Sequence, residues 1–274
     1  GGGPGGYLAV FPVLRGQEAG DGIVEEMTLE YPGTLALILG GSCELALHLA
    51  RAMIGDALRP ILTYRNEAGR DRIVRGLEGL SGRYESRRLD LADRTTLEAL
   101  LDSWGEDPLD FTVDFAHGDY EELVAAADDD VLERYFRENV SSRACFLRRA
   151  ARIMLRRRKG RMVFVSSGAA ENPNPGQGFY AASKLASEAL YRSVGLELGR
   201  RGVTTVILRP GYVRAGRGRA YLEREGKQVS RKIPTGKALE GEEVARTILF
   251  LLSTHARNLN ATVVTMDGGL SSGK

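Results

Sequence analysis

The sequence is poor in cysteine and has no long apolar run. Cys43 and Cys145 are its only cysteines. They are too few for a disulfide framework, and no Cys/His grouping has zinc-site spacing, so we expect no bound metal. The most apolar stretches, such as 35–39 and 162–165, are far shorter than the roughly 20 residues that cross a bilayer. No secretory signal is apparent, so we expect a cytoplasmic protein without a membrane segment.

The charges are nearly balanced. The 38 Lys and Arg residues face 36 Asp and Glu residues, for a net charge of +2. This leaves no global basic field that would indicate a nucleic acid partner. With 43% hydrophobic and 27% charged residues, the composition is that of a globular protein rather than a disordered or membrane chain. The 274 residues suffice for one large α/β domain or two small ones.

From residue 35 onward, short β-branched and Leu-rich runs alternate with longer segments of helical period, which is typical of a parallel sheet wrapped by helices. The expected strands are 35–39, 60–64, 83–89, 109–115, 161–166, 204–209 and 261–266. The expected helices lie near 44–55, 67–79, 94–104, 130–158, 178–200 and 241–253. The order predicts an α/β fold of Rossmann-like type, a doubly wound parallel seven-stranded sheet with helices on both faces, in a single domain over 34–274.

Two regions do not follow this repeat. Residues 1–33 are expected to form an N-terminal extension with a flexible leader, and the apolar runs within 7–34 are compatible with a hairpin. Residues 214–238 are rich in Arg, Lys and Gly and follow the sixth strand. They are predicted to form a mobile flap, with a plain surface loop as the alternative. The flap would cover the carboxyl ends of the strands, where ligands bind in such sheets.

The first strand runs into a glycine-bearing turn and then a helix. Backbone amides of such a turn approach a pyrophosphate, and the helix N-terminus supplies positive potential. Residues expected to contact a dinucleotide here are Gly40, Ser42, Glu44 and Leu45. The Glu44 carboxylate either faces the phosphate and repels it, or turns outward and favours the helix N-terminus. The alternative is a helix start that binds no nucleotide.

The ends of the second and third strands bear on the choice of nucleotide. Arg65 follows the second strand, where a carboxylate would instead bind a ribose hydroxyl. A guanidinium there attracts a 2′-phosphate, so the sequence favours NADP(H) over NAD(H). Asp90 and Leu91 follow the third strand. Asp90 is placed to bind an adenine amino group, to cap a helix, or to do both.

A candidate catalytic group lies further along the chain. Tyr180 and Lys184 are four residues apart on an expected helix, so they share one face. An ammonium near a phenol favours the phenolate and lowers its pKa from about 10 toward the range of a general acid and base. Ser167 follows the strand expected at 161–166, and Asn139 lies within the long helix expected at 130–158.

With these four residues the chain resembles the short-chain dehydrogenase/reductase (SDR) family over about residues 34–269. The resemblance implies a nicotinamide-dependent enzyme that transfers hydride directly. It implies that Tyr180 exchanges the proton with the carbonyl or alcohol oxygen and that Ser167 hydrogen-bonds the same oxygen. It also implies that Lys184 holds the nicotinamide ribose and that Asn139 helps to order a proton-relay water.

Other motifs match the family or depart from it. Pro210, Gly211 and Val213 belong to what looks like the family's Pro-Gly turn beside the nicotinamide, and Asp267-Gly268-Gly269 looks like its C-terminal signature. The family's Gly-x-x-x-Gly-x-Gly turn keeps only its first glycine, because Glu44 and Ala46 replace the others. Asp114-Phe115-Ala116-His117-Gly118 stands where the family has Asn-Asn-Ala-Gly. We leave His117 out of the mechanism because a lone loop histidine is more often solvated than catalytic.

Basic residues cluster in and after the helices expected at 130–158 and 178–200. Arg158 and Arg201 are predicted to flank the active-site entrance. The resemblance extends to the 3-oxoacyl-carrier-protein reductases of the family, in which basic residues at matching places dock an acidic carrier. A coenzyme A phosphate would suit the same charges. The alternative is a solvated basic face that complements helix C-termini.

The sequence therefore predicts an NADP(H)-dependent oxidoreductase that interconverts a ketone and a secondary alcohol. A 3-oxoacyl thioester of a carrier protein or coenzyme A is the leading substrate. The alternatives are an SDR acting on a polyol, steroid or secondary-metabolite ketone, and a non-catalytic Rossmann binding module. Family members commonly pair the two long helices, so we expect a homodimer or homotetramer.

Overall fold

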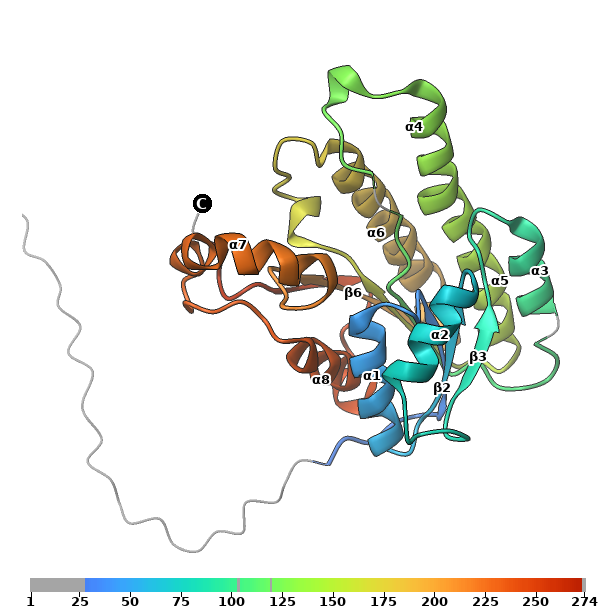
Figure 1. Cartoon of the computed structure of the whole chain (residues 1–274). Coiled ribbons are helices and arrows are strands. Elements are labelled where there is room, and N and C mark those ends of the chain that lie inside the picture. Colours follow the sequence, from blue (N-terminus) through green and yellow to red (C-terminus); the bar gives the residue numbers. More distant parts are fainter. Residues whose placement is uncertain (1–27, 103, 119, 273–274) are drawn as a thin grey trace, which may run out of the picture.

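The computed structural model describes residues 28–102, 104–118 and 120–272. Seven parallel strands form one sheet in the order β3-β2-β1-β4-β5-β6-β7 (Figure 1). Their bounds are β1 (Leu35–Leu39), β2 (Arg59–Tyr64), β3 (Glu85–Arg88), β4 (Phe111–Asp114), β5 (Gly160–Val165), β6 (Val203–Pro210) and β7 (Thr262–Met266). This confirms the predicted doubly wound sheet. The winding reverses between β1 and β4, and ligands bind at the carboxyl ends of the strands at such a switch point.

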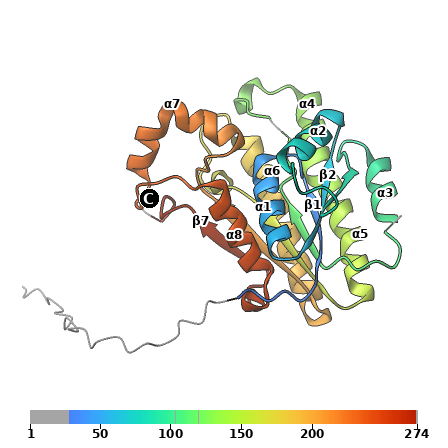
Figure 2. The same cartoon turned by 60° about the horizontal axis from the view of Figure 1, so that its bottom comes forward.

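Eight α-helices surround the sheet in the described residues. They are α1 (Glu44–Gly55), α2 (Glu67–Gly76), α3 (Arg94–Asp102), α4 (Asp129–Phe136), α5 (Ser142–Arg156), α6 (Gly178–Leu198), α7 (Gly216–Lys232) and α8 (Gly241–Leu252). Helices α1, α2 and α8 pack on one face, and α3, α5 and α6 on the other (Figures 1 and 2). No helix in this part of the chain is both long and apolar enough to span a bilayer.

Strand β1 shows why the sequence forms this two-sided core. Successive strand side chains point to opposite faces of a sheet. Ala36 and Ile38 pack with α1 and α8, whereas Leu35, Leu37 and Leu39 pack with α3 and α5. All five residues are buried. A strand covered on both faces is therefore apolar throughout, which gives the continuous Leu-rich run seen in the sequence.

Three expectations about the elements need comment. The helix predicted over 130–158 is continuous from Asp129 to Arg156, but a π-helical turn at Arg137–Ser141 lies between α4 and α5. The segment 214–238 is not a plain loop, because it contains α7, which projects beside β6 in Figure 1. The hairpin predicted within 7–34 falls largely on residues 1–27, which lie outside the described residues.

Candidate active site

A cavity of about 450 Å³ opens at the carboxyl ends of β1, β2, β3 and β4. We call it the first cavity. Its volume is within the range of small-molecule and cofactor sites. Six of the residues singled out from the sequence line it: Gly40, Ser42, Arg65, Asp90, Leu91 and Asn139. The predicted cluster at the switch point of the sheet is therefore present as one concave site.

Gly40 fits the turn that follows β1 because no larger residue would. Its φ is +67°, in the left-handed region that favours glycine. A Cβ atom at Gly40 would lie 2.8 Å from the backbone nitrogen of Ala116. The backbone of the turn after β1 therefore lies so close to the loop after β4 that a side chain at residue 40 would clash with it. Together they form one wall of the first cavity.

Glu44 begins α1 and turns away from the first cavity, which is one of the two orientations considered above. Its carboxylate accepts a hydrogen bond from the Gly216 backbone N–H at 2.8 Å and pairs with Arg219. Burial raises the pKa of Glu44, but the Gly216 hydrogen bond and the Arg219 guanidinium outweigh it, so the pKa falls below its usual value. Glu44 therefore links the start of α1 to the start of α7.

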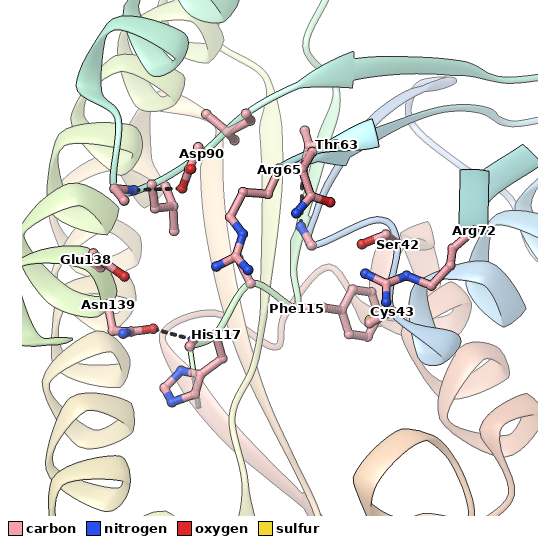
Figure 3. A pocket seen from close by; sticks show the side chains of 17 residues that line it. Ser42, Cys43, Thr63, Arg65, Arg72, Asp90, Phe115, His117, Glu138 and Asn139 are labelled. Atoms are coloured by element: carbon pink, nitrogen blue, oxygen red, sulfur yellow. Dashed lines mark hydrogen bonds between the residues drawn. The ribbon is translucent and has the colours of Figure 1, made fainter. Parts of the chain in front are cut away.

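Two arginines reach the first cavity from the region after β2. Figure 3 shows the guanidinium groups of Arg65 and Arg72 pointing into the cavity. Neither has an ion-pair partner within the described ranges. The sequence analysis missed Arg72. Arg72 is the sixth of the ten residues of α2, and nothing in its spacing marked it as a cavity residue. The two groups give this end of the cavity a positive charge suited to a phosphate.

Asp90 lies across the cavity from Arg65, at the end of β3 (Figure 3). Its carboxylate accepts a hydrogen bond from Ala92 N–H at 3.0 Å, which closes a short turn before α3. The helix itself starts beside Asp93, whose carboxylate accepts from Thr95 N–H. Asp90 thus caps a turn rather than the helix. A carboxylate that borders the cavity remains available to an adenine amino group.

Tyr180 and Lys184 lie one turn apart on α6, as their spacing predicts. The Lys184 ammonium lies 5.8 Å from the centre of the Tyr180 ring and donates to the Val165 carbonyl at 2.9 Å. Lys184 is only 3% exposed. Burial, aided by the Arg143 guanidinium, lowers the pKa of Lys184 to about 7. Burial therefore disfavours the charged form of Lys184.

Ser167 follows β5 and borders a second cavity of about 540 Å³. Pro210 and Gly211 line the same cavity, as do residues of the C-terminal turn near Asp267. The Ser167 hydroxyl oxygen accepts a hydrogen bond from Ala169 N–H at 3.2 Å. Its own proton can therefore be donated to a ligand oxygen in this second cavity.

Asn139 is 2% exposed and lies in the π-helical turn. Its side-chain oxygen accepts from Gly118 N–H at 2.8 Å, drawn as a dashed line in Figure 3. Its amide nitrogen donates to the Tyr135 carbonyl, and its own carbonyl accepts from Arg143. Asn139 thus anchors the loop after β4. Its part in a proton relay stays a prediction.

His117 is not the solvated histidine expected from the sequence. Its ring packs edge to face with Tyr180, with ring centres 4.6 Å apart. Its Nε2 atom lies 2.7 Å from the Tyr135 hydroxyl. Burial lowers the pKa of His117 well below its usual value, and the cations Lys184 and Arg143 add to this. His117 is therefore neutral and forms part of the wall beside Tyr180.

Two expected cofactor contacts have other surroundings. Leu45 packs against the hydrophobic core beneath α1. Val213 is buried in the same core and bridges to Leu239. Neither side chain lines the first or the second cavity. Their role as cofactor contacts stays a prediction.

The prediction that Arg158 and Arg201 flank the entrance is wrong for a single chain. Arg158 lies in the turn before β5, and Arg201 ends the 3-10 turn before β6. Both therefore lie at the amino ends of these strands. Ser167 follows the carboxyl end of β5, at the opposite edge of the sheet. The sequence correctly predicted that α5 and α6 lie side by side. The prediction did not take into account that the helices end at the amino ends of the strands that follow them.

Comparisons with known proteins agree with this geometry. The family model described as enoyl-(acyl carrier protein) reductase matches residues 43–271. The chain is 25% identical over 246 residues to the 3-oxoacyl-(acyl-carrier-protein) reductase FabG of Salmonella typhimurium, covering 88% of this chain and 99% of that protein. It is 26% identical over 239 residues to the reductase MabA of Mycobacterium tuberculosis, covering 86% and 92%.

Solved structures show the same fold. A short chain dehydrogenase/reductase family protein matches with a TM-score of 0.77 and 26% identity, covering 89% of this chain and all of that one. A gluconate 5-dehydrogenase from Burkholderia cenocepacia, in complex with NADP and tartrate, matches with a TM-score of 0.80 and 23% identity, covering 89% and 97%. The chain belongs to the short-chain dehydrogenase/reductase family of oxidoreductases.

Proposed function

We propose that this protein is an NADP(H)-dependent oxidoreductase that interconverts a ketone and a secondary alcohol. The observation that carries the proposal is the Tyr180–Lys184 pair on α6. Tyr180 touches His117 in the wall of the first cavity, and α6 packs against the segment that bears Ser167. The helix that carries the proton donor and the cation thus packs against the loop of the first cavity and against the segment that follows Ser167 in the second cavity.

The residues of the first cavity suit a dinucleotide. The Gly40 turn leaves no room for a side chain, so the backbone itself is exposed to a ligand. Arg65 and Arg72 supply cations for the 2′-phosphate that distinguishes NADP(H) from NAD(H). Asp90 is available to the adenine. When bound, the nicotinamide supplies or accepts the hydride.

The chain's own groups handle the proton. Tyr180 donates a proton to the carbonyl oxygen during reduction and takes one back during oxidation. A protonated Lys184 favours the Tyr180 phenolate that this exchange leaves behind. Ser167 donates a hydrogen bond to the same oxygen and so polarises the carbonyl. The remaining contribution of the protein is to orient these groups.

For the substrate, a 3-oxoacyl thioester is our first proposal. It is supported by the named reductases that align over most of this chain. A second candidate is a polar, hydroxylated ketone, because the second cavity presents several polar side chains. These are Asn172, Asn174, Gln177, Tyr212 and Lys232. Such a lining suits hydroxyl and carboxylate groups better than an acyl chain.

A paired substrate assay separates the two candidates. NADPH oxidation is followed with an acetoacetyl thioester and with a keto sugar acid at matched concentrations. Lys232→Ala serves as the specificity variant, because Lys232 lines the second cavity at the last residue of α7, whereas Arg217, which lies over the Tyr180 ring, is at the start of that helix. A thioester substrate predicts little change in this variant. Loss of sugar acid reduction, with thioester reduction absent throughout, would reject the first proposal.

We also propose a homodimer or homotetramer that pairs α5 and α6. Leu185 and Leu196 on α6 are 43% and 74% exposed, so this helix presents apolar surface to a second copy. Light scattering at micromolar protein would show the assembled mass. A single monomeric mass would reject the proposal. An acyl carrier remains a proposed partner, without support from the position of Arg158 and Arg201 in one chain.

A further inference from the structure

An ion pair without solvent contact lies behind the candidate active site. Asp114 ends β4, and Arg143 lies in the first turn of α5. Both side chains are 0% exposed, and Arg143 Nε donates to Asp114 Oδ2 at 2.7 Å. The Tyr191 hydroxyl donates to the same carboxylate oxygen at 3.0 Å. A buried pair of this kind costs desolvation energy, so it needs an explanation beyond stability.

The remaining donors of Arg143 bind the elements that carry the proposed catalytic groups. One terminal nitrogen donates to the Asn139 carbonyl and to Ser187 Oγ, the latter at 3.1 Å. The other donates to the Ala116 carbonyl in the loop after β4. Ser187 lies on α6, three residues after Lys184. The guanidinium therefore connects β4, the following loop, the π-helical turn and α6.

Arg143 and Lys184 also share a neighbour. The Arg143 guanidinium carbon lies 5.2 Å from the centre of the Phe164 ring, and the Lys184 nitrogen lies 5.0 Å from it. Two buried cations thus contact one aromatic side chain. Their mutual repulsion disfavours a proton on Lys184, whereas the Asp114 carboxylate favours one.

Other titratable or charged groups face Lys184 from the surrounding elements, namely Cys43, His117, Tyr180, Glu188 and Arg217. Among charged side chains, Arg143 has the largest influence on the pKa of Lys184, after the effect of burial. Asp114 follows with the opposite sign. The two halves of one ion pair therefore act on Lys184 in opposite directions.

We propose that Arg143 and Asp114 are positioning residues that set the charge of Lys184 and thereby the pH range in which Tyr180 works. This inference rests on the proposed function for its meaning in catalysis. Neither residue needs to touch substrate. Arg143 holds Asn139 and the loop after β4 in place, and its charge, balanced by Asp114, determines how readily Lys184 takes a proton.

The test replaces the pair one charge at a time. Asp114→Asn removes the anion and leaves the Arg143 cation, so the midpoint of the Lys184 titration falls by roughly one pH unit. Adding Arg143→Met to that variant removes the cation as well. The midpoint then rises above that of Asp114→Asn, because the cation that opposes a proton on Lys184 is gone. The expected order places Asp114→Asn below both the wild type and the double variant.

The readout is the pH-dependent ¹³C shift of the Lys184 side chain in lysine-labelled protein without cofactor. Its resonance is identified by its loss in Lys184→Met. Asp110→Asn is the matched control, because Asp110 is a buried carboxylate at the other end of β4, bonded to Thr34 and Leu35. This control leaves the Lys184 midpoint unchanged. The pH profile of ketone reduction should follow the same order as the midpoints.

Equal midpoints in the wild type and Asp114→Asn would overturn the proposal, as would a shift in Asp110→Asn of the same size as in Asp114→Asn. If Asp114→Asn does not fold, Arg143→Met is compared with the double variant, because it keeps the Asp114 anion without the Arg143 cation. A higher midpoint in Arg143→Met supports the proposal, and equal midpoints refute it. Failure of the proposed function would look different, with no NADPH oxidation although the midpoints keep the expected order.

Discussion

The two arginines of the first cavity allow a quantitative test of cofactor choice. Arg65 and Arg72 both line the cavity, and both are solvent-exposed. A hydrogen bond to a charged group contributes about 1.5–3 kcal/mol. Because Arg65 and Arg72 are exposed, we expect their bonds to the 2′-phosphate to contribute at the lower end of this range. Replacing either arginine by alanine should therefore cost about 1.5 kcal/mol, or roughly tenfold in the Kd for NADPH. The double variant should lose roughly 100-fold if the sites are independent.

The assay is fluorescence titration with NADPH and with NADH. The Kd for NADH should change little, because NADH lacks the 2′-phosphate. Arg70→Ala is the matched control, because Arg70 lies on the same helix but pairs with Glu67 and does not line the cavity. Equal losses for NADH and NADPH, or a loss in Arg70→Ala as large as in Arg72→Ala, would refute the assignment of these arginines to the phosphate.

Two further predictions concern contacts that hold the site together. Glu44→Gln should loosen the start of α7, with amide exchange at Gly216 faster by about two- to fivefold, since a partly exposed pair contributes up to about 1 kcal/mol. The lowered pKa of Glu44 means that the wild-type contact persists above the usual carboxyl pKa and is lost as the pH falls through the lowered value. After correction for the intrinsic exchange rate, acid should therefore speed exchange at Gly216 in the wild type but not in Glu44→Gln. An identical pH response in the two proteins would exclude the contact between Glu44 and Gly216 as its cause. Glu188→Gln should cost about 3 kcal/mol of unfolding free energy in urea, because the buried carboxylate binds Arg209 and Ser166. A cost below about 1 kcal/mol would show that the pair is not structural.

Much of the fold could be predicted because it depends on local pattern. The buried run of β1 is apolar throughout and that of β5 is apolar from Met162 onward, and the sequence located both within one residue. The π-helical turn between α4 and α5 could not be predicted in this way. It occurs where the Asn139 carbonyl is bonded to a side chain of the next turn and to α6. Such tertiary contacts leave no trace in hydrophobic periodicity.

In the candidate site, too, local spacing could be predicted from the sequence and tertiary contacts could not. The spacing of four residues on a helix predicted that Tyr180 lies beside Lys184. The positions of Arg65 and Asp90 after neighbouring strands predicted that they line one cavity. The pairing of Asp114 with Arg143 joins residues 29 positions apart, and no spacing rule indicates it. It gives Asp114, the first residue of the departing motif, a structural role as the partner of a buried arginine.

The central claim is hydride transfer at the Tyr180–Lys184 pair, and an isotope experiment tests it most directly. The protein is incubated with a ketone substrate and NADPH that carries deuterium at the nicotinamide C4, and the alcohol is analysed by mass spectrometry. We predict one deuterium on the carbinol carbon with the wild type and a rate at least roughly 100-fold lower with Tyr180→Phe. An alcohol without deuterium at that carbon, or full activity in Tyr180→Phe, would contradict the account.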